Sequence, residues 1–286
     1  MRIVVLGGGL STDREVSLVS ATSVCKALRR KGHQAVFVDM FLGLEIPEGN
    51  LETIFDEPDG FCGNAIIQEK APDITLVRQA RSTSLRSRIG PGVLEACSIA
   101  DCVYLGLHGE DGEDGKIQAA LDLLGVPYTG SGALGSAMAM DKSIAKIIMR
   151  SEGILTPAWK LYSVNENNVE QLAETLMFPC VIKVVNGGSS IGVYMPETSE
   201  EAICALRDSI QYGGRIIVED KIKGRELTVP VVGEKALFPI EIVPPASGKF
   251  DYVAKYQSGE KGATEICPAI LSEEETLLVQ DAAMSA

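Results

Sequence analysis

The order of apolar and polar positions predicts alternating strands and helices in the first part of the chain. Arg2 to Leu6 form a short buried-strand pattern, and the apolar positions that follow a run of glycines recur at helical spacing. His33 to Asp39 is predicted to be a second strand, which makes the opening a βαβ unit. Val103 to Leu107 repeats the strand pattern before a helix that begins near Lys116. An open parallel sheet is therefore expected, with ligands at the carboxyl ends of its strands.

The glycine-rich turn after the first strand does not fit a dinucleotide site. The GxGxxG order is absent, and Asp13 and Glu15 place carboxylates where a pyrophosphate would lie. Glu15 has two interpretations. A glutamate in the first turn of a helix commonly compensates the helix dipole at the surface. It also follows a turn at the ligand-binding edge of the sheet, so it is a candidate partner for an ammonium group.

The loop from His108 to Gly115 contains one histidine, four carboxylates and three glycines directly after a strand. Such a segment is unsuited to a core and favours a functional site. Its carboxylates are not spaced as in an EF-hand, and a single histidine makes a weak transition-metal site. His33, by contrast, is expected to be a surface turn residue.

The second half of the chain contains shorter strands and helices. Asp141 is expected to cap a helix whose early position holds Lys142, and a lysine there opposes the helix dipole unless an anion lies nearby. The pattern after this helix predicts strands at Ala158–Tyr162, Cys180–Val185, Ile191–Met195, Arg215–Glu219, Thr228–Val232 and Ala236–Val243, and helices at Glu166–Met177 and Glu200–Ile210.

A Gly-Gly-Ser-Ser turn is predicted to join Cys180–Val185 to Ile191–Met195 as two strands of one sheet. Glycines allow a close approach of the backbone to a ligand, serine hydroxyls donate to phosphate oxygens, and Lys183 adds a positive charge. The turn is thus a candidate lid over a nucleotide triphosphate. The alternative is a polar hairpin turn with an outward-pointing lysine.

Two further segments carry candidate binding residues. Glu219 and Glu226 lie at the end of a strand and after the following turn, where carboxylates suit adenine amino and ribose hydroxyl groups; a solvated charged turn is the alternative. Residues 244–262 form a long loop with Lys255 and Tyr256, and loops of this length are more often functional than not.

Composition narrows the class of protein. The 286 residues suffice for two or three domains, and 45% of them are apolar. Lysine and arginine total 26 against 39 aspartates and glutamates, a net charge of −13, which argues against nucleic-acid and anionic-membrane surfaces. An anionic substrate would need locally placed lysines or a divalent metal. The seven cysteines form no CxxC pair, and no signal or membrane-spanning segment is present, so a cytoplasmic, reduced protein is expected.

Taken together, these segments resemble the D-alanine:D-alanine ligases of the ATP-grasp superfamily. The most specific match is HGEDGEDGKIQA, which fits the HGxxGEDGxIQ element of that family. The remaining matches follow in the order of the family: DREVSL (Asp13–Leu18), PYTGSG (Pro127–Gly132), MDK (Met140–Lys142), VIKVVNGGSSIG (Val181–Gly192), VEDKIKGRELTV (Val218–Val229) and DYVAKY (Asp251–Tyr256).

The resemblance implies an α/β fold with three parts. An N-terminal open parallel-sheet (preATP-grasp) substrate domain would span residues 1–130. A central ATP-grasp subdomain would span 131–219 and an incomplete C-terminal one 220–286, both of α+β type. The implied reaction is ATP-dependent joining of two D-alanines through an acyl phosphate, for peptidoglycan precursors, with Mg²⁺ or Mn²⁺ and in a homodimer.

The resemblance also implies roles for individual residues. Substrate contacts would come from Glu15 and His108, and a catalytic hydrogen-bonded trio from Glu15, Ser189 and Tyr256. Lys142 and Lys183 would hold the α- and β-phosphates of ATP, and Lys255 the γ-phosphate. Ser189 and Ser190 would form a lid over the phosphates. Adenine and ribose would be held by Glu219, Ile222 and Glu226.

The metal ligands of the family, an Arg-x-Asp and a Glu-x-Asn pair, have no counterpart up to Ala286, so no metal-ligating residue is predicted within the chain. Without them this polypeptide is expected to be nearly inactive, and normal dipeptide formation in a phosphate-release assay would contradict that expectation. Two alternatives remain open. One is a non-catalytic nucleotide-binding remnant, and the other is an ATP-grasp ligase that uses another amine.

Overall fold

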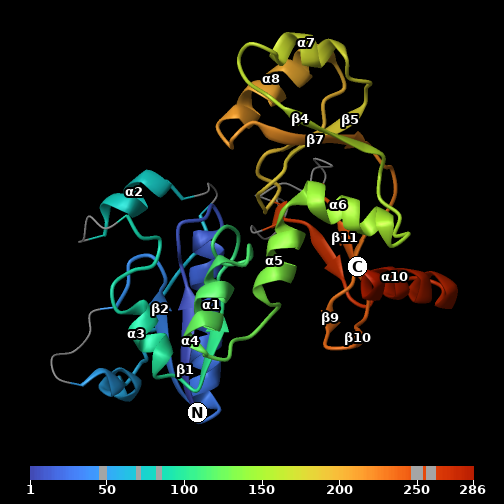
Figure 1. Cartoon of the computed structure of the whole chain (residues 1–286). Coiled ribbons are helices and arrows are strands. Elements are labelled where there is room, and N and C mark those ends of the chain that lie inside the picture. Colours follow the sequence, from blue (N-terminus) through green and yellow to red (C-terminus); the bar gives the residue numbers. More distant parts are fainter. Residues whose placement is uncertain (45–49, 69–71, 82–85, 246–253, 256–261) are drawn as a thin grey trace. The chain divides into compact units, whose positions relative to one another are not determined.

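The computed structural model describes all residues except 45–49, 69–71, 82–85, 246–253 and 256–261. The chain forms two compact units, Met1–Met140 (unit 1) and Asp141–Ala286 (unit 2). Figure 1 shows the helices and strands of each. The domain boundaries expected at residues 130 and 219 stay predictions. No helix among the described residues is long and apolar enough to cross a membrane.

Unit 1 is built on the predicted parallel sheet. Strand β1 (Arg2–Gly7) lies between β2 (Gln34–Asp39) and β3 (Cys102–Leu105), and all pair in parallel. The even and odd residues of β1 face opposite layers. Val4 and Leu6 pack in a cluster with residues of α3 (Val93–Ser98) and α4 (Lys116–Leu124), whereas Ile3 and Val5 pack in another with α1 (Arg14–Arg30).

Close packing explains a glycine at the end of β1. A Cβ atom on Gly7 would lie 2.5 Å from the Cβ of Ala21 on α1. Helix α1 can therefore approach the strand closely, which directs the following glycine turn and the start of α1 toward the carboxyl edge of the sheet.

The composition of the segments 41–59 and 78–92 predicts peripheral loops or a short edge hairpin, and the described part of the first segment contains a short helix. Residues Leu51–Asp56 form the short 3-10 helix η1, capped by the Asn50 side chain, and Ile54 and Phe55 are buried in the core. The expectation was wrong there because Asn50 is a good N-cap and two apolar residues follow it. The other helices of unit 1 are α2 (Ile74–Gln79) and α5 (Ala133–Met140).

Unit 2 contains an antiparallel sheet covered by helices. Its strands are β4 (Trp159–Ser163), β7 (Arg215–Asp220), β5 (Cys180–Val184) and β6 (Val193–Tyr194), in that spatial order. Helices α7 (Val169–Glu174) and α8 (Ser199–Ile210) pack with Ile182 and Ile216 in one core cluster (Figure 1). Because side chains alternate along a strand, Lys183 and Glu219 face away from that cluster.

Helix α6 (Lys142–Ser151) begins as predicted. The Asp141 side chain accepts hydrogen bonds from the backbone N–H groups of Ser143, at 2.9 Å, and Ile144, at 3.0 Å. The predicted helix at Glu166–Met177 is shorter, and it corresponds to α7.

Two predicted strands of unit 2 are each divided by a proline. Thr228–Val232 divides into β8 (Glu226–Thr228) and β9 (Val231–Val232), and Ala236–Val243 into β10 (Lys235–Ala236) and β11 (Ile240–Val243). Pro230 and Pro239 lack the N–H group that a continuous ladder needs, so the pieces join different sheets. Strand β11 pairs with β8 and with β12 (Thr264–Ile266), and β9 pairs with β10.

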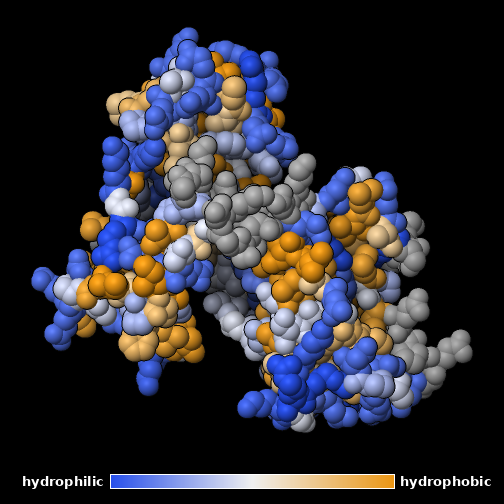
Figure 2. Space-filling view, turned by 180° about the vertical axis from the view of Figure 1, so that it is seen from behind, coloured by the Kyte–Doolittle hydropathy of each residue, from blue (hydrophilic) through white to orange (hydrophobic). Residues whose placement is uncertain are grey.

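The C-terminal helix α10 (Glu273–Ser285) starts with a capping box of Ser272 and Glu275, a pair whose spacing in the sequence is typical of such a box. None of its residues is buried. Apolar residues gather at the surface of this part of unit 2 (Figure 2), and the large exposed ones are Val231, Val232, Leu237, Phe238, Ile270, Leu277, Leu278 and Met284.

Candidate functional site

A buried carboxylate on β7 lies between two ammonium groups. Glu219 pairs through Oε1 with Nζ of Lys183 on β5, and its Oε2 lies 2.9 Å from Nζ of Lys146 on α6. Only 6% of Glu219 and 8% of Lys146 are exposed. Glu219 is therefore not the solvated turn charge that the sequence left open as an alternative.

Lys142 completes this group of cations. Its Nζ donates to the carbonyl oxygen of Gly187 at 2.8 Å, in the loop after β5. Burial of the ammonium lowers the pKa of Lys142, and the positive charge of Lys183 lowers it further, with a smaller effect of the same sign from Lys255. The lysines predicted as phosphate ligands thus act on one another electrostatically within unit 2. We call Lys142, Lys146, Lys183 and Lys255 the lysine cluster.

The loop beside the lysine cluster joins two strands, as predicted. Strands β5 and β6 pair in antiparallel fashion, with Lys183 opposite Val193. Ser189 and Ser190 both adopt left-handed conformations, with φ of 50° and 62°. At Gly192, φ is 70° and a Cβ atom would lie 2.6 Å from Val184, so this position requires glycine.

The other predicted nucleotide residues of unit 2 follow β7. Ile222 is 69% exposed, and Glu226 is the exposed first residue of β8. Lys255 is described and lies near enough to Lys142 to affect its pKa. Tyr256 lies outside the described residues, so the trio of Glu15, Ser189 and Tyr256 stays a prediction.

The predicted substrate residues of unit 1 have defined partners. Glu15, in the first turn of α1, accepts a hydrogen bond from the backbone N–H of Gln68 at 2.6 Å. The His108 ring lies between Ser20, at 3.3 Å, and Glu113, at 3.4 Å. Burial raises the pKa of Glu113, but hydrogen bonds from His108 and the Gly109 N–H outweigh this effect, and the pKa is lowered.

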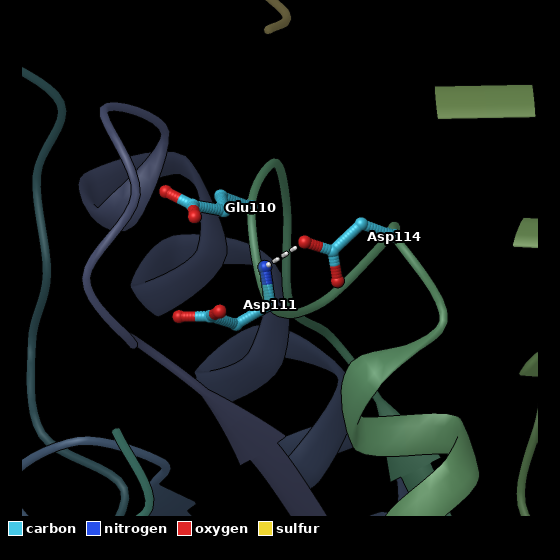
Figure 3. Close-up of side chains that lie close together, drawn as sticks. All are labelled: Glu110, Asp111 and Asp114. Atoms are coloured by element: carbon cyan, nitrogen blue, oxygen red, sulfur yellow. Dashed lines mark hydrogen bonds between the residues drawn. The ribbon is translucent and has the colours of Figure 1, made fainter. Parts of the chain in front are cut away.

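The carboxylates of Glu110, Asp111 and Asp114 lie close together in the same loop (Figure 3). Lys116 occupies the space between them, with its Nζ 3.2, 3.2 and 2.8 Å from their respective oxygens. Arg88 also pairs with Glu110 and Asp111. Because these two cations offset two of the three negative charges and Lys116 lies between the carboxylates, the residues do not fit a resident metal ion. These ion pairs tie the loop to Arg88 and to Lys116, the first residue of α4.

A buried ion pair fixes the glycine turn of unit 1. A guanidinium N–H of Arg14 donates to the carbonyl of Gly9 at 2.7 Å, and Arg14 pairs with Asp39 at 2.5 Å. Asp39 also accepts from the backbone N–H groups of Phe41 and Leu42, each at 2.9 Å. The ends of β1 and β2 are thereby tied together beside Glu15.

Sequence reasoning missed the structural charges that support both groups of residues: Arg14, Asp39, Arg88 and Lys146. For Lys146 a signal was present. It lies four positions after Lys142, on the same face of the predicted helix, so it was placed to reach the same site.

Comparisons with known proteins agree with the resemblance. The family model described as "D-ala D-ala ligase N-terminus" matches residues 2–131, and the one described as "D-ala D-ala ligase C-terminus" matches 148–286. A protein of Lacticaseibacillus casei (strain BL23) named D-alanine--D-alanine ligase is 40% identical over 263 residues, which cover 91% of this chain and 71% of the relative. The chain belongs to the D-alanine–D-alanine ligase family.

Solved structures of this ligase family extend the similarity to the fold. The D-alanine--D-alanine ligase of Bacillus anthracis matches with a TM-score of 0.66 and 28% identity, over 100% of this chain and 77% of that one. The VanG D-Ala:D-Ser ligase of Enterococcus faecalis matches with a TM-score of 0.67 and 26% identity, over 99% of this chain and 81% of that one. The expected α/β fold with an ATP-grasp part is confirmed.

Proposed function

We propose that this chain binds ATP at the lysine cluster for the reaction of its family, which joins two D-alanines into D-alanyl-D-alanine for peptidoglycan precursors. That the 286-residue polypeptide by itself is nearly inactive stays a prediction. The observation that carries the proposal is the convergence of Lys142 and Lys183, with Lys255 nearby, beside the glycine-serine loop in a member of the ligase family. A chain with an excess of negative charge needs such a local concentration of ammonium groups to bind a polyphosphate.

The reaction has two steps. A carboxylate oxygen of the first D-alanine attacks the γ-phosphorus of ATP, ADP leaves, and an acyl phosphate forms. The amine of the second D-alanine then attacks the acyl carbon, loses a proton, and phosphate leaves. Both steps move negative charge among phosphoryl oxygens, and positioned ammonium groups stabilise that charge.

The residues of this chain supply binding and orientation for these steps. Lys142 and Lys183 contact the α- and β-phosphates and Lys255 the γ-phosphate, while Ser189 and Ser190 exclude water above them. Glu219, Ile222 and Glu226 hold adenine and ribose. In unit 1, Glu15 and His108 hold the first D-alanine, with the Glu15 carboxylate available to its ammonium group.

We further propose that Mg²⁺ or Mn²⁺ accompanies the nucleotide, that the protein is cytoplasmic and that it forms a homodimer. Among the described residues, the one group of carboxylates close enough to hold a metal is already paired with Lys116 and Arg88. No step of the reaction is therefore assigned to a metal ion held by those residues. When bound, the ion would supply charge neutralisation at the phosphates.

Titration calorimetry of the 286-residue chain tests the nucleotide site. We expect one ATP per chain, and we expect Lys183→Met to weaken ATP binding by about tenfold to a hundredfold, because a charge-assisted contact is worth about 1.5–3 kcal/mol. Stabilisation by D-alanine but not by L-alanine in a thermal shift assay tests the amino-acid site. Equal ATP binding by wild type and Lys183→Met would contradict the assignment.

ATP affinity is expected to fall as the pH rises, beginning below the ordinary titration range of lysine. Burial and Lys183 lower the pKa of Lys142 in the free protein, whereas bound phosphates would raise it again. Between the two pKa values, ATP binding takes up a proton and therefore weakens with increasing pH. Calorimetry from pH 7 upward measures this slope. Lys142→Met should remove part of it, and an unchanged slope would contradict the role of Lys142.

A further inference from the structure

Lys146 has no role in the reaction described so far, although it is the most buried lysine of the lysine cluster, at 8% exposed. Its Nζ lies 2.9 Å from Oε2 of Glu219 and donates to the hydroxyl of Thr156. Both partners belong to unit 2 and the Lys146 side chain is only 10% exposed, so we expect no direct contact with a phosphate. A buried charge is costly unless it is paired, so burial of Lys146 depends on its ion pair with Glu219.

Glu219 has one negative charge and two cationic partners. Its Oε1 pairs with Lys183 and its Oε2 with Lys146. If Lys146 were absent, Glu219 and Lys183 would form a neutral pair, and the side of the sheet that carries Lys183 would lose one positive charge. With Lys146 present, the three groups together keep a net positive charge beside Lys142.

We propose that Lys146 is a positioning residue that neutralises Glu219, so that Lys183 keeps its charge for the polyphosphate, and that it thereby sets the preference of the site for triphosphates over monophosphates. This inference rests on the proposed ATP site. Because Lys146 touches neither substrate nor the reacting atoms, its effect is electrostatic and increases with the charge of the ligand.

Binding of ATP, ADP and AMP to the Lys146→Met variant tests the inference by calorimetry. We expect the affinity for ATP to fall about tenfold, the affinity for ADP to fall by less, and the affinity for AMP to stay within about threefold of wild type. The loss of one positive charge weakens binding more when the ligand carries more negative charge. Lys146→Arg retains the charge and should restore most of the ratio between ATP and AMP affinities. A merely structural role would weaken all three ligands equally, and that outcome would overturn the proposal.

Lys160→Met is the matched control. Lys160 is an exposed lysine of β4 that pairs in register with Val218, so it faces the α7–α8 side of the sheet, opposite to Glu219. Its loss should leave the ratio between ATP and AMP affinities unchanged. If wild type itself binds no ATP, the proposed function fails; if wild type binds ATP but Lys146→Met keeps its ratio, only the present inference fails.

A double variant keeps the test decisive if Lys146→Met folds poorly. Lys146→Met combined with Glu219→Gln removes both charges and leaves Lys183 cationic. Any effect of the Glu219 change on adenine binding is common to ATP and AMP, so the ratio of the two affinities is the readout. We expect this ratio to return to within about threefold of wild type. A ratio as low as that expected for Lys146→Met would contradict charge neutralisation as the role of Lys146.

Discussion

Glu219→Gln is expected to lower the free energy of unfolding of unit 2 by about 3–5 kcal/mol, the usual effect of removing one partner from a buried ion pair. The substitution keeps the shape of the side chain but removes the only carboxylate that Lys146 and Lys183 contact in the ion pairs described. Lys146, whose side chain is 10% exposed, would then lack a counter-charge, and Lys183, at 29%, would lose its partner in this ion pair. The cause of the loss is the buried charge that remains, rather than a missing contact.

Urea unfolding followed by tryptophan fluorescence measures this loss. Trp159 is the only tryptophan of the chain, and it pairs in register with Glu219, so its signal reports on unit 2. Glu170→Gln is the matched control, since its pair with Arg207 is about half exposed on each side, at 55% and 53%. A surface pair of this kind contributes about 0–1 kcal/mol. Similar losses in the two variants would show that Glu219 is not a buried structural charge.

Asp39→Asn is expected to have a comparable effect in unit 1, again about 3–5 kcal/mol. The side chains of Arg14 and Asp39 are only 8% and 10% exposed, so the guanidinium would remain buried without its counter-charge. The glycine turn depends on this pair, because Arg14 also holds the carbonyl of Gly9. Glu15 follows Arg14 directly, so we expect the Glu15 side chain to become less well ordered as well.

Hydrogen exchange read by mass spectrometry separates unit 1 from unit 2. We expect faster exchange in β1 and β2 of Asp39→Asn and unchanged exchange in β5 and β7. Combining Arg14→Met with Asp39→Asn removes the uncompensated charge and should recover part of the loss. Glu52→Gln, whose pair with Arg2 leaves Glu52 66% exposed, should show little change. Exchange in Asp39→Asn no faster than in Glu52→Gln would refute the prediction.

Regular, locally encoded features were predictable from the sequence. The Asp141 cap, the capping box of α10 and the turn between β5 and β6 each depend on residues within a few positions of one another. The βαβ unit follows from consecutive strand and helix patterns along the chain. The positions of Lys142 and Lys183 followed from those elements. Errors arose where one proline changed the pairing of a strand, as at Pro230, because an apolar run predicts a strand without saying which sheet it joins.

The supporting charges could not be predicted in the same way. Arg14 and Asp39 are 25 positions apart, and Lys146 on α6 and Glu219 on β7 come from distant parts of the sequence. A pattern of single residues does not show which distant charges become neighbours when both are buried. The roles of Ser189 and Tyr256 in a shared hydrogen-bonded trio likewise remain predictions.

The two left-handed serines have a consequence for loop closure over a ligand. An L-residue in this conformation costs about 1–2 kcal/mol relative to a right-handed one, and Ser189 and Ser190 are adjacent. Part of the energy of this segment is thus held as backbone torsion. If contact with a ligand lets either serine relax, the released energy adds to the affinity. The affinity for the ligand would then rise without any additional contact between the loop and the ligand.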